Sequence, residues 1–244
     1  METRVAEVGD GIYQLMTYLE EMDFAVNQYL VTGEEPLLFH TGMRGLFPLV
    51  TGAVERVMPI ASLRWIGFGH VEADECGSMN QWLSAAPDAT VIHGTLGCMV
   101  SIGDMADRLP RPLGPGEKLD IGGHRLEWID TPHVPHAWEA GVLLDHTTHT
   151  LLCGDLFSRV GHYPPTTADD IVAPADEAED GFASMSLHPA SGSTIRRLAE
   201  LDIDALALMH GPVFTGDCRD ALHGLADSTD RRITRAGEGS SPQP

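Results

Sequence analysis

The chain has 244 residues, and 43% of them are hydrophobic, which is enough for one large domain with a substantial buried core. Its 36 Asp and Glu against 15 Lys and Arg give a formal net charge of −21, and so acidic a surface argues against binding nucleic acid or anionic membranes. No apolar run reaches the roughly 18 to 20 residues of a membrane span and the first residues do not form a signal peptide, so we expect a cytoplasmic protein.

The first half of the chain is predicted to form two hairpins followed by alternating helices and strands. Apolar residues alternate on both sides of Gly9-Asp10-Gly11, which predicts a hairpin over 4–15. The segment 27–42 repeats this pattern around the turn sequence GEEP. The following segments are predicted, in chain order, as a helix over 46–58, a strand over 63–69, a helix over 78–86 and a strand over 89–94.

The second half contains two further hairpins and two helices. One hairpin covers 117–133 and turns at Gly122-Gly123, and the next covers 139–157. The remaining segments are predicted as a helix over 191–201, a strand over 205–211 and a closing helix over 217–235. No composition break marks a linker, so we expect one domain over 1–236 and a disordered tail over 237–244. Strand pairs in both halves, each followed by helices, predict an α/β fold with two packed sheets and helices outside.

The four cysteines, Cys76, Cys98, Cys153 and Cys218, are scattered along the chain without a CxxC pair. This spacing argues against a disulfide scaffold and an iron–sulfur cluster. We expect reduced and mostly buried thiols.

The stretch FGHVEADECG places His70, Glu72, Asp74 and Glu75 within six positions, directly after a predicted strand. Carboxylates repel one another, so the stretch is either a solvated acidic loop or a cation site. If it stays extended, the alternate spacing aims His70, Glu72 and Asp74 in the same direction. By itself the pattern leaves both interpretations open.

Three other strand ends also carry potential ligands. A turn with two prolines holds His133 and His136, Asp155 ends the apolar run TLLCGDLF, and His210 ends ALALMHG. A carboxylate at the position of Asp155 is costly unless something compensates its desolvation. Four strand ends that each deliver ligands are what a metal site at one edge of a sheet sandwich requires.

With these residues in place, the sequence resembles the metallo-β-lactamase superfamily. Within it, the chain is most similar to the lactamase-type domain of flavodiiron proteins and to stand-alone oxygen-binding di-iron proteins. After the H-x-E-x-D motif, the intervals of 61, 18 and 54 residues to the next His, Asp and His are close to the family's spacing. The resemblance covers nearly the whole chain and implies an αββα sandwich of two mixed sheets that carries a dinuclear metal site.

The resemblance also assigns a role to each candidate ligand. The 18-residue interval before Asp155 selects His136 over His133. Candidates for catalytic roles beyond the metal ligands are His133, Glu75 and Tyr163. The implied ligands are His70, Glu72 and His136 for the first metal, Asp74 and His210 for the second, and Asp155 as the bridge.

One position departs from the family pattern. Flavodiiron proteins commonly have a histidine directly after the Asp of the first motif, often as a ligand of the second metal, whereas this chain has Glu75. This carboxylate could bind the metal, reach a bound water, or make a hydrogen bond outside the coordination shell. The sequence leaves these three roles open.

Three histidines and three carboxylates favour two iron ions, because anionic oxygen donors stabilise oxidised iron, with zinc or manganese as alternatives. Such a centre implies an oxidoreductase that binds or reduces O₂ or NO, or oxygenates an organic substrate. In the sequence as given, we expect neither a flavodoxin domain nor a phosphate-cradling glycine loop. We therefore expect no flavin in this chain and an electron-donor protein of the flavodoxin or rubredoxin type as partner; a homodimer is a further arrangement to test.

The alternative is a dinuclear hydrolase, similar to a thioesterase or lactonase, in which a metal-bridging hydroxide is the nucleophile. The same ligands serve either chemistry, so the motif does not choose between them. Among the remaining residues, we expect Trp138 to pack in the core and the hairpin-turn histidines His124, His146 and His149 to be exposed.

Overall fold

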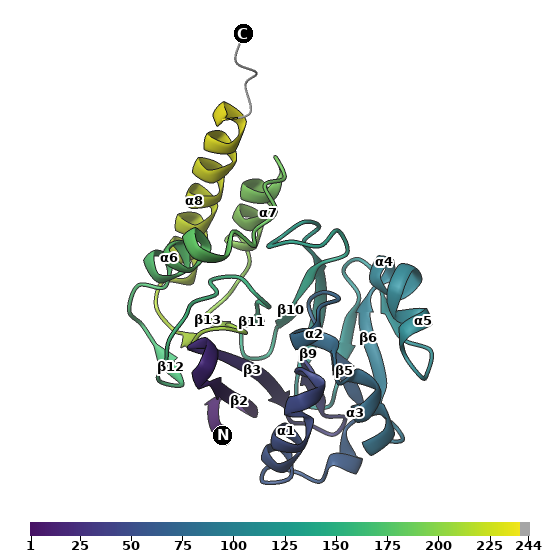
Figure 1. Ribbon diagram of the computed structural model, residues 1–244. Helices are drawn as coiled ribbons and strands as arrows, with labels where there is room; N and C mark the ends of the chain where they lie inside the picture. Colours follow the sequence, from purple (N-terminus) through teal and green to yellow (C-terminus); the bar gives the residue numbers. More distant parts are fainter. Residues whose placement is uncertain (240–244) are drawn as a thin grey trace.

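The computed structural model describes residues 1–239, whose strands form two seven-stranded sheets (Figure 1). The first sheet consists, in spatial order, of β1 (Thr3–Gly9), β2 (Ile12–Leu19), β3 (Phe24–Val31), β4 (Leu37–Phe39), β5 (Trp65–Gly67), β6 (Thr90–Gly94) and β7 (Arg111–Leu113). The second consists of β12 (Thr166–Thr167), β14 (Val213–Phe214), β13 (Ala205–Ala207), β11 (Thr150–Leu152), β10 (Gly141–Asp145), β9 (Arg125–Asp130) and β8 (Lys118–Asp120). Both sheets contain parallel and antiparallel pairs, so both are mixed.

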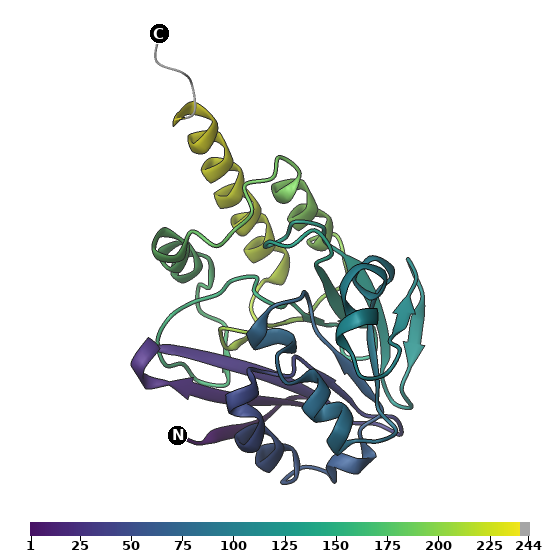
Figure 2. The same ribbon diagram turned by 45° about the vertical axis from the view of Figure 1, so that its right-hand side comes forward.

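Helices lie on the outer faces of the two sheets. The views in Figures 1 and 2 place α6, α7 and α8 together on one side of the molecule and α1 and α3 on another. The α-helices are α1 (Phe47–Val54), α2 (Ala73–Cys76), α3 (Met79–Ala85), α4 (Thr95–Gly97), α5 (Gly103–Met105), α6 (Val172–Phe182), α7 (Ser191–Leu198) and α8 (Cys218–Gly239). Short 3₁₀ turns cover η1 (Glu20–Met22), η2 (Arg44–Leu46) and η3 (Ile60–Ser62), and a π-helical turn, η4 (Cys98–Ile102), joins α4 to α5.

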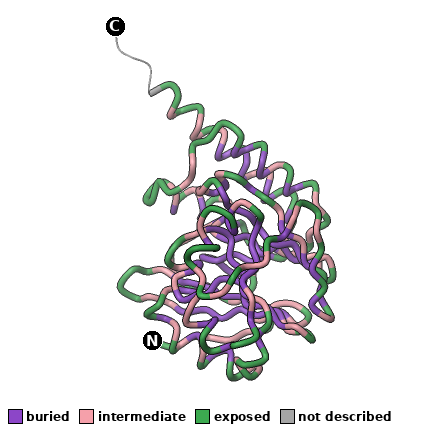
Figure 3. The backbone as a smooth tube through the Cα atoms, turned by 90° about the vertical axis from the view of Figure 1, so that its right-hand side faces the viewer, coloured by how far each residue is buried: buried purple, intermediate pink, exposed green. Residues whose placement is uncertain are grey.

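Alternation along the strands produces three apolar layers. In β3, Tyr29 and Val31 face the second sheet, while Leu30 faces α1 and α3. In β10, Leu143 faces the first sheet, while its neighbours on either side pack against α7 and α8. Successive side chains of a strand point to opposite faces, so each sheet is buried on both sides. Figure 3 shows the buried residues running through the interior beneath exposed outer helix turns.

The predicted α/β sandwich with two mixed sheets is therefore confirmed, and the predicted hairpins, helices and strands are all present with shifted ends. The four cysteines are free and buried, as expected. The helical turns over 95–105, helix α6 and the strands β7, β12 and β14 were not predicted. Helix α8 continues to Gly239, into the segment 237–244 predicted as a tail, and residues 240–244 lie outside the described residues. Within residues 1–239, no helix has the length and apolar character needed to cross a membrane.

Two local expectations were wrong, and one condition was not met. The stretch after β5 would have had to stay extended to aim its three side chains in the same direction, but α2 begins at Ala73 and puts Asp74 in a helical turn. His124 is only 7% exposed, since its Nδ1 lies 2.7 Å from an oxygen of the buried Asp145. Trp138 is 54% exposed instead of packing in the core.

Candidate metal centre

The segments that carry the predicted ligands leave their strands close together at one edge of the sandwich. His70 follows β5, His136 lies between β9 and β10, Asp155 follows β11 and His210 follows β13. Backbone hydrogen bonds fix these segments relative to one another. The amide of Gly141 donates to the carbonyl of Gly69 at 2.9 Å and thereby joins the two sheets, and the amide of Met209 donates to the carbonyl of Gly154 at 3.0 Å.

Three of the predicted ligands form a tight first cluster. The Nε2 atoms of His70 and His136 are 2.8 Å apart, and Glu72 Oε2 lies 2.9 Å from each of them. Asp155 Oδ2 is 3.7 Å from both Nε2 atoms. Together, these four residues present ligand atoms that all lie within 4.8 Å of one another.

The other two predicted ligands form a second cluster on the opposite side of Asp155. Asp74 Oδ2 and Asp155 Oδ1 each lie 3.2 Å from His210 Nε2. The two oxygens of Asp155 therefore face different clusters, one toward His70 and His136 and the other toward His210. One carboxylate placed in this way has the geometry of a bridge between two cations.

The protein holds the rings that would bind metal. His210 Nδ1 is 2.8 Å from the carbonyl oxygen of Ala25, to which it donates, so Nε2 is left free to face the cluster. Phe24 stacks on the His210 ring with centroids 4.2 Å apart. A metal binds a ring nitrogen that carries no proton. The hydrogen bond donated by Nδ1 selects the tautomer in which Nε2 is unprotonated.

The charges around these rings favour cations. Burial by itself lowers the pKa of His70, but the charge of Glu75 and hydrogen bonds to Glu72 and Glu75 outweigh it and raise the pKa to about 12. Burial likewise opposes the hydrogen bonds to Asp155 and Asp74 that raise the pKa of His210 to about 10. In the metal-free chain a proton on each imidazole supplies the positive charge that the carboxylates require.

The donor set fits a pair of metal ions. Two facing imidazole nitrogens 2.8 Å apart repel unless a cation or proton lies between them. Among the described residues of the two clusters, the buried Asp74 Oδ1 has no hydrogen-bond partner, and the contact given for Asp155 Oδ1 is the one of 3.2 Å with His210 Nε2. Buried polar atoms normally have partners, so an orphaned oxygen at this position is consistent with metal ligation.

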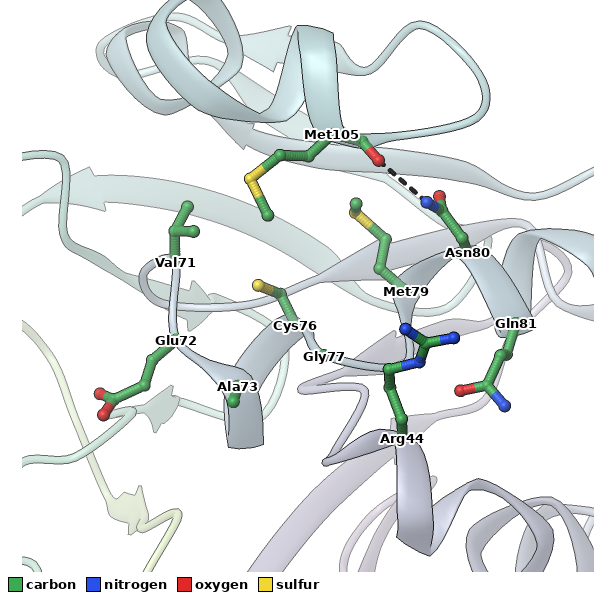
Figure 4. Close-up of a pocket in the computed structure, with 10 residues that line it drawn as sticks. All are labelled: Arg44, Val71, Glu72, Ala73, Cys76, Gly77, Met79, Asn80, Gln81 and Met105. Atoms are coloured by element: carbon green, nitrogen blue, oxygen red, sulfur yellow. Dashed lines mark hydrogen bonds between the residues drawn. The ribbon is translucent and has the colours of Figure 1, made fainter.

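A cavity of about 310 Å³ opens over both clusters. Its polar floor includes Glu72, Asp74, His136, Asp155 and His210, and its walls include Met22, Phe24, Phe182, Ser158 and Ser184. A second cavity, of about 330 Å³, adjoins Glu72. Figure 4 shows Cys76, Met79 and Met105 converging there, whereas the carboxylate of Glu72 points away from them. The first cavity is therefore the one that gives access to the clusters.

The other predicted candidates lie outside the clusters. His133 stacks on His188 with ring centroids 4.4 Å apart, so the structure places His136, not His133, against His70. Tyr163 is buried, and its hydroxyl accepts a hydrogen bond of 3.3 Å from Asn27, which also donates to carbonyls on either side of His210. Burial raises the pKa of Tyr163.

Sequence reasoning missed His40, Phe24 and Phe182. His40 is fully buried, has a φ of 65° and lies with Nε2 3.6 Å from Glu75 Oε1. The signal that identified Asp155 and His210, a polar residue that directly follows an apolar strand, also applies to His40 after β4. The two phenylalanines carried no such signal, because only the folded chain brings them to the cavity.

Metal uptake should release protons. Metal ions bind neutral imidazoles, whereas His70 and His210, with pKa values raised to about 12 and about 10, are protonated at pH 7 in the metal-free protein. The apparent affinity should therefore rise with pH, steeply up to about 10, where His210 loses its proton, and less steeply from there to about 12, where His70 does. Titration calorimetry of the metal-free protein with Zn²⁺, in two buffers of different ionisation enthalpy, measures the protons released. An affinity that does not change with pH would contradict this.

Comparison with known proteins gives a consistent picture. The model of a family described as "ODP family beta lactamase" matches residues 24–211. The curated protein "Putative diflavin flavoprotein A 2" of Synechocystis is 25% identical over 197 residues, which cover 77% of this chain and 33% of that protein. The chain thus spans about a third of the length of the curated relatives that it matches.

Solved structures share the fold. Rubredoxin oxygen:oxidoreductase from Desulfovibrio gigas superposes with a TM-score of 0.78 at 15% identity over 95% of this chain and 62% of that one. The Flv1 flavodiiron core from Synechocystis gives a TM-score of 0.76 at 18% identity over 96% of this chain and 61% of that one.

Proposed function

Because the chain belongs to the family described as ODP family beta lactamase, we propose that it is a non-haem di-iron oxidoreductase that reacts with O₂ and receives electrons from an external donor. The proposed ligands are those implied by the sequence: His70, Glu72 and His136 for the first iron, Asp74 and His210 for the second, and Asp155 for both.

The observation that carries this proposal is the position of Asp155. Its Oδ2 lies 3.7 Å from the two histidines of the first cluster, and its Oδ1 lies 3.2 Å from His210. The surrounding donors are half carboxylates, which suit oxidised iron better than an imidazole-rich set does. The names of relatives, among them a rubredoxin oxygen:oxidoreductase and a flavodiiron core, support iron and O₂ chemistry for this chain as well.

The cavity residues suit a small neutral molecule. When bound, the iron pair supplies two electrons and positions at which O₂ or NO can bind. Phe24 and Phe182 make an edge-to-face contact with ring centroids 5.8 Å apart, and together with Met22 they present an apolar wall above His210. Apolar side chains at this position favour a small neutral molecule such as O₂ over an anion. A cavity of about 310 Å³ is also much larger than a diatomic molecule, so an organic substrate fits beside it.

Electrons for complete reduction of O₂ are proposed to come from another protein. Reduction of O₂ to water takes four electrons, and two ferrous ions supply two of them. A flavodoxin or rubredoxin is the proposed donor; the name of the Desulfovibrio relative pairs that protein with rubredoxin.

The chain should consume O₂ only when it is supplied with both iron and a donor. We expect steady O₂ uptake by the iron-loaded chain with reduced rubredoxin or flavodoxin, and none above background with NADH alone. A Clark electrode measures the rate, and zinc-loaded protein is the control. An iron-loaded chain that is inert to O₂ with every donor, but whose zinc form hydrolyses thioesters, would instead identify the hydrolase.

A further inference from the structure

Glu75 directly follows the proposed ligand Asp74, but its side chain turns away from the second cluster. It is fully buried. Its Oε2 accepts the backbone N–H groups of Gly69 and of His70, the latter at 2.8 Å. Its Oε1 lies 3.2 Å from His70 Nδ1, the ring nitrogen opposite the one that faces the first cluster.

The carboxylate of Glu75 also fits between two of the ligand-bearing segments. A Cβ atom added to Gly69 or to Gly154 would lie 3.1 Å from a Glu75 oxygen, and these glycines directly precede His70 and Asp155. Gly154 has a φ of 55°, which further favours glycine at this position. Glycine at positions 69 and 154 therefore leaves the space that the Glu75 carboxylate occupies.

The loop after β4 also contacts Glu75. The backbone amide and hydroxyl of Thr41 donate to the Glu75 carbonyl at 2.6 and 3.1 Å, and His40 Nε2 lies 3.6 Å from Oε1. The buried Glu75 carboxylate thus has the two backbone N–H groups on one oxygen and the rings of His70 and His40 facing the other. A buried anion with several donors around it is stable in one orientation and costly to disturb.

We propose that Glu75 is a positioning residue, which holds the ring of His70 through Nδ1 and thereby presents Nε2 to the first metal, and which does not bind the second metal. The inference rests on the dinuclear centre proposed above but not on the identity of its metal. Carboxylates that accept a hydrogen bond from a ligating histidine orient the ring and increase its basicity. The second metal then receives three protein ligands, Asp74, His210 and the shared Asp155.

The test compares Glu75→Gln with Glu139→Gln by titration of the metal-free proteins with Zn²⁺. Glu139 is a matched control, since it is also buried and its Oε1 accepts the N–H of Val71 at 3.2 Å, in the same loop, whereas within residues 1–239 no hydrogen bond or ion pair joins it to the His70 ring. Competition with a chelator gives the affinities. Nitrogen-15 NMR of the histidine rings distinguishes the first metal, read at His70 and His136, from the second, read at His210.

For Glu75→Gln, we expect about a 10- to 100-fold loss of affinity at the first metal and little change at the second. In the zinc-loaded variant the Nδ1 proton of His70 should move upfield and exchange faster with water, which a merely structural change elsewhere would not cause. Glu139→Gln should leave both affinities and this proton unchanged. If Glu75→Gln does not fold, Glu75→Asp, which keeps the charge but withdraws it from His70, should show the same loss to a smaller extent.

Two results would overturn the proposal. One is a greater loss at the second metal than at the first, which would make Glu75 a ligand there. The other is an unchanged first-metal affinity together with an unchanged His70 proton. Two Zn²⁺ ions bound by a chain that takes up no iron would contradict the di-iron function, yet the role of Glu75 would still be tested, because the titration uses only Zn²⁺.

Discussion

Replacing Asp155 with Asn is expected to remove both metal ions together. The side chain keeps its shape, but it loses its negative charge and one of the two anionic oxygens that face His70 and His210, at 3.7 and 3.2 Å. We expect the affinity at each metal to fall about 100-fold or more. Residues that only orient a ligand typically contribute about 10- to 100-fold, and Asp155 is proposed as a ligand itself. Chelator competition with Fe²⁺ or Zn²⁺ measures both affinities.

Single-cluster variants provide the comparison. His70→Ala should weaken mainly the first metal and His210→Ala mainly the second, because each contributes to one cluster. Asp130→Asn is the matched control, since this carboxylate of the same sheet accepts a hydrogen bond from Trp128 and lies outside the clusters. Two metals held by Asp155→Asn with the affinity of the unaltered chain would show that Asp155 does not bridge.

Replacing Trp82 with Ala is expected to destabilise the metal-free fold by roughly 3–5 kcal/mol, the range for removing a large buried aromatic ring. Trp82 is fully buried between α3 and the first sheet, and its ring packs edge-on against Phe47 at 5.2 Å. Its indole N–H donates to the carbonyl of Thr41 at 3.1 Å, in the loop that also holds Glu75. Urea unfolding without metal measures the change, because bound metal would add its own stabilisation.

Trp82→Phe separates the two contributions of this residue. It keeps most of the ring volume and loses the hydrogen bond to Thr41, so a smaller loss of about 1–3 kcal/mol is expected. A change below about 1 kcal/mol in Trp82→Ala would mean that the core relaxes around the missing ring, contrary to the close packing typical of protein interiors.

The fold and the candidate ligands could be predicted because both depend on local patterns. Alternating apolar residues mark the strands, and a polar residue directly after an apolar run identified Asp155 and His210. The role expected for each ligand came from the resemblance to the metallo-β-lactamase superfamily, which rests on the spacing relative to H-x-E-x-D. Segments without such a pattern were missed: α6 is rich in acidic residues, and β12 and β14 are only two residues long.

The surroundings of the ligands were not predictable from local patterns. The direction of the Glu75 side chain depends on Gly69, Gly154 and His40, which come from three different loops. His124 was expected at the surface because it follows a Gly-Gly turn, yet the tertiary fold places it against the buried Asp145. In both cases the deciding contact joins residues distant in sequence.

The central claim is that this chain holds two iron ions joined by Asp155. Its most direct measurement is the EPR spectrum of partially reduced, iron-loaded protein whose metal content has been determined on the same sample. We predict two irons per chain and a mixed-valence signal from a spin-coupled pair, which Asp155→Asn abolishes. One metal per chain, or two irons that give only the signals of isolated ions, would contradict the claim.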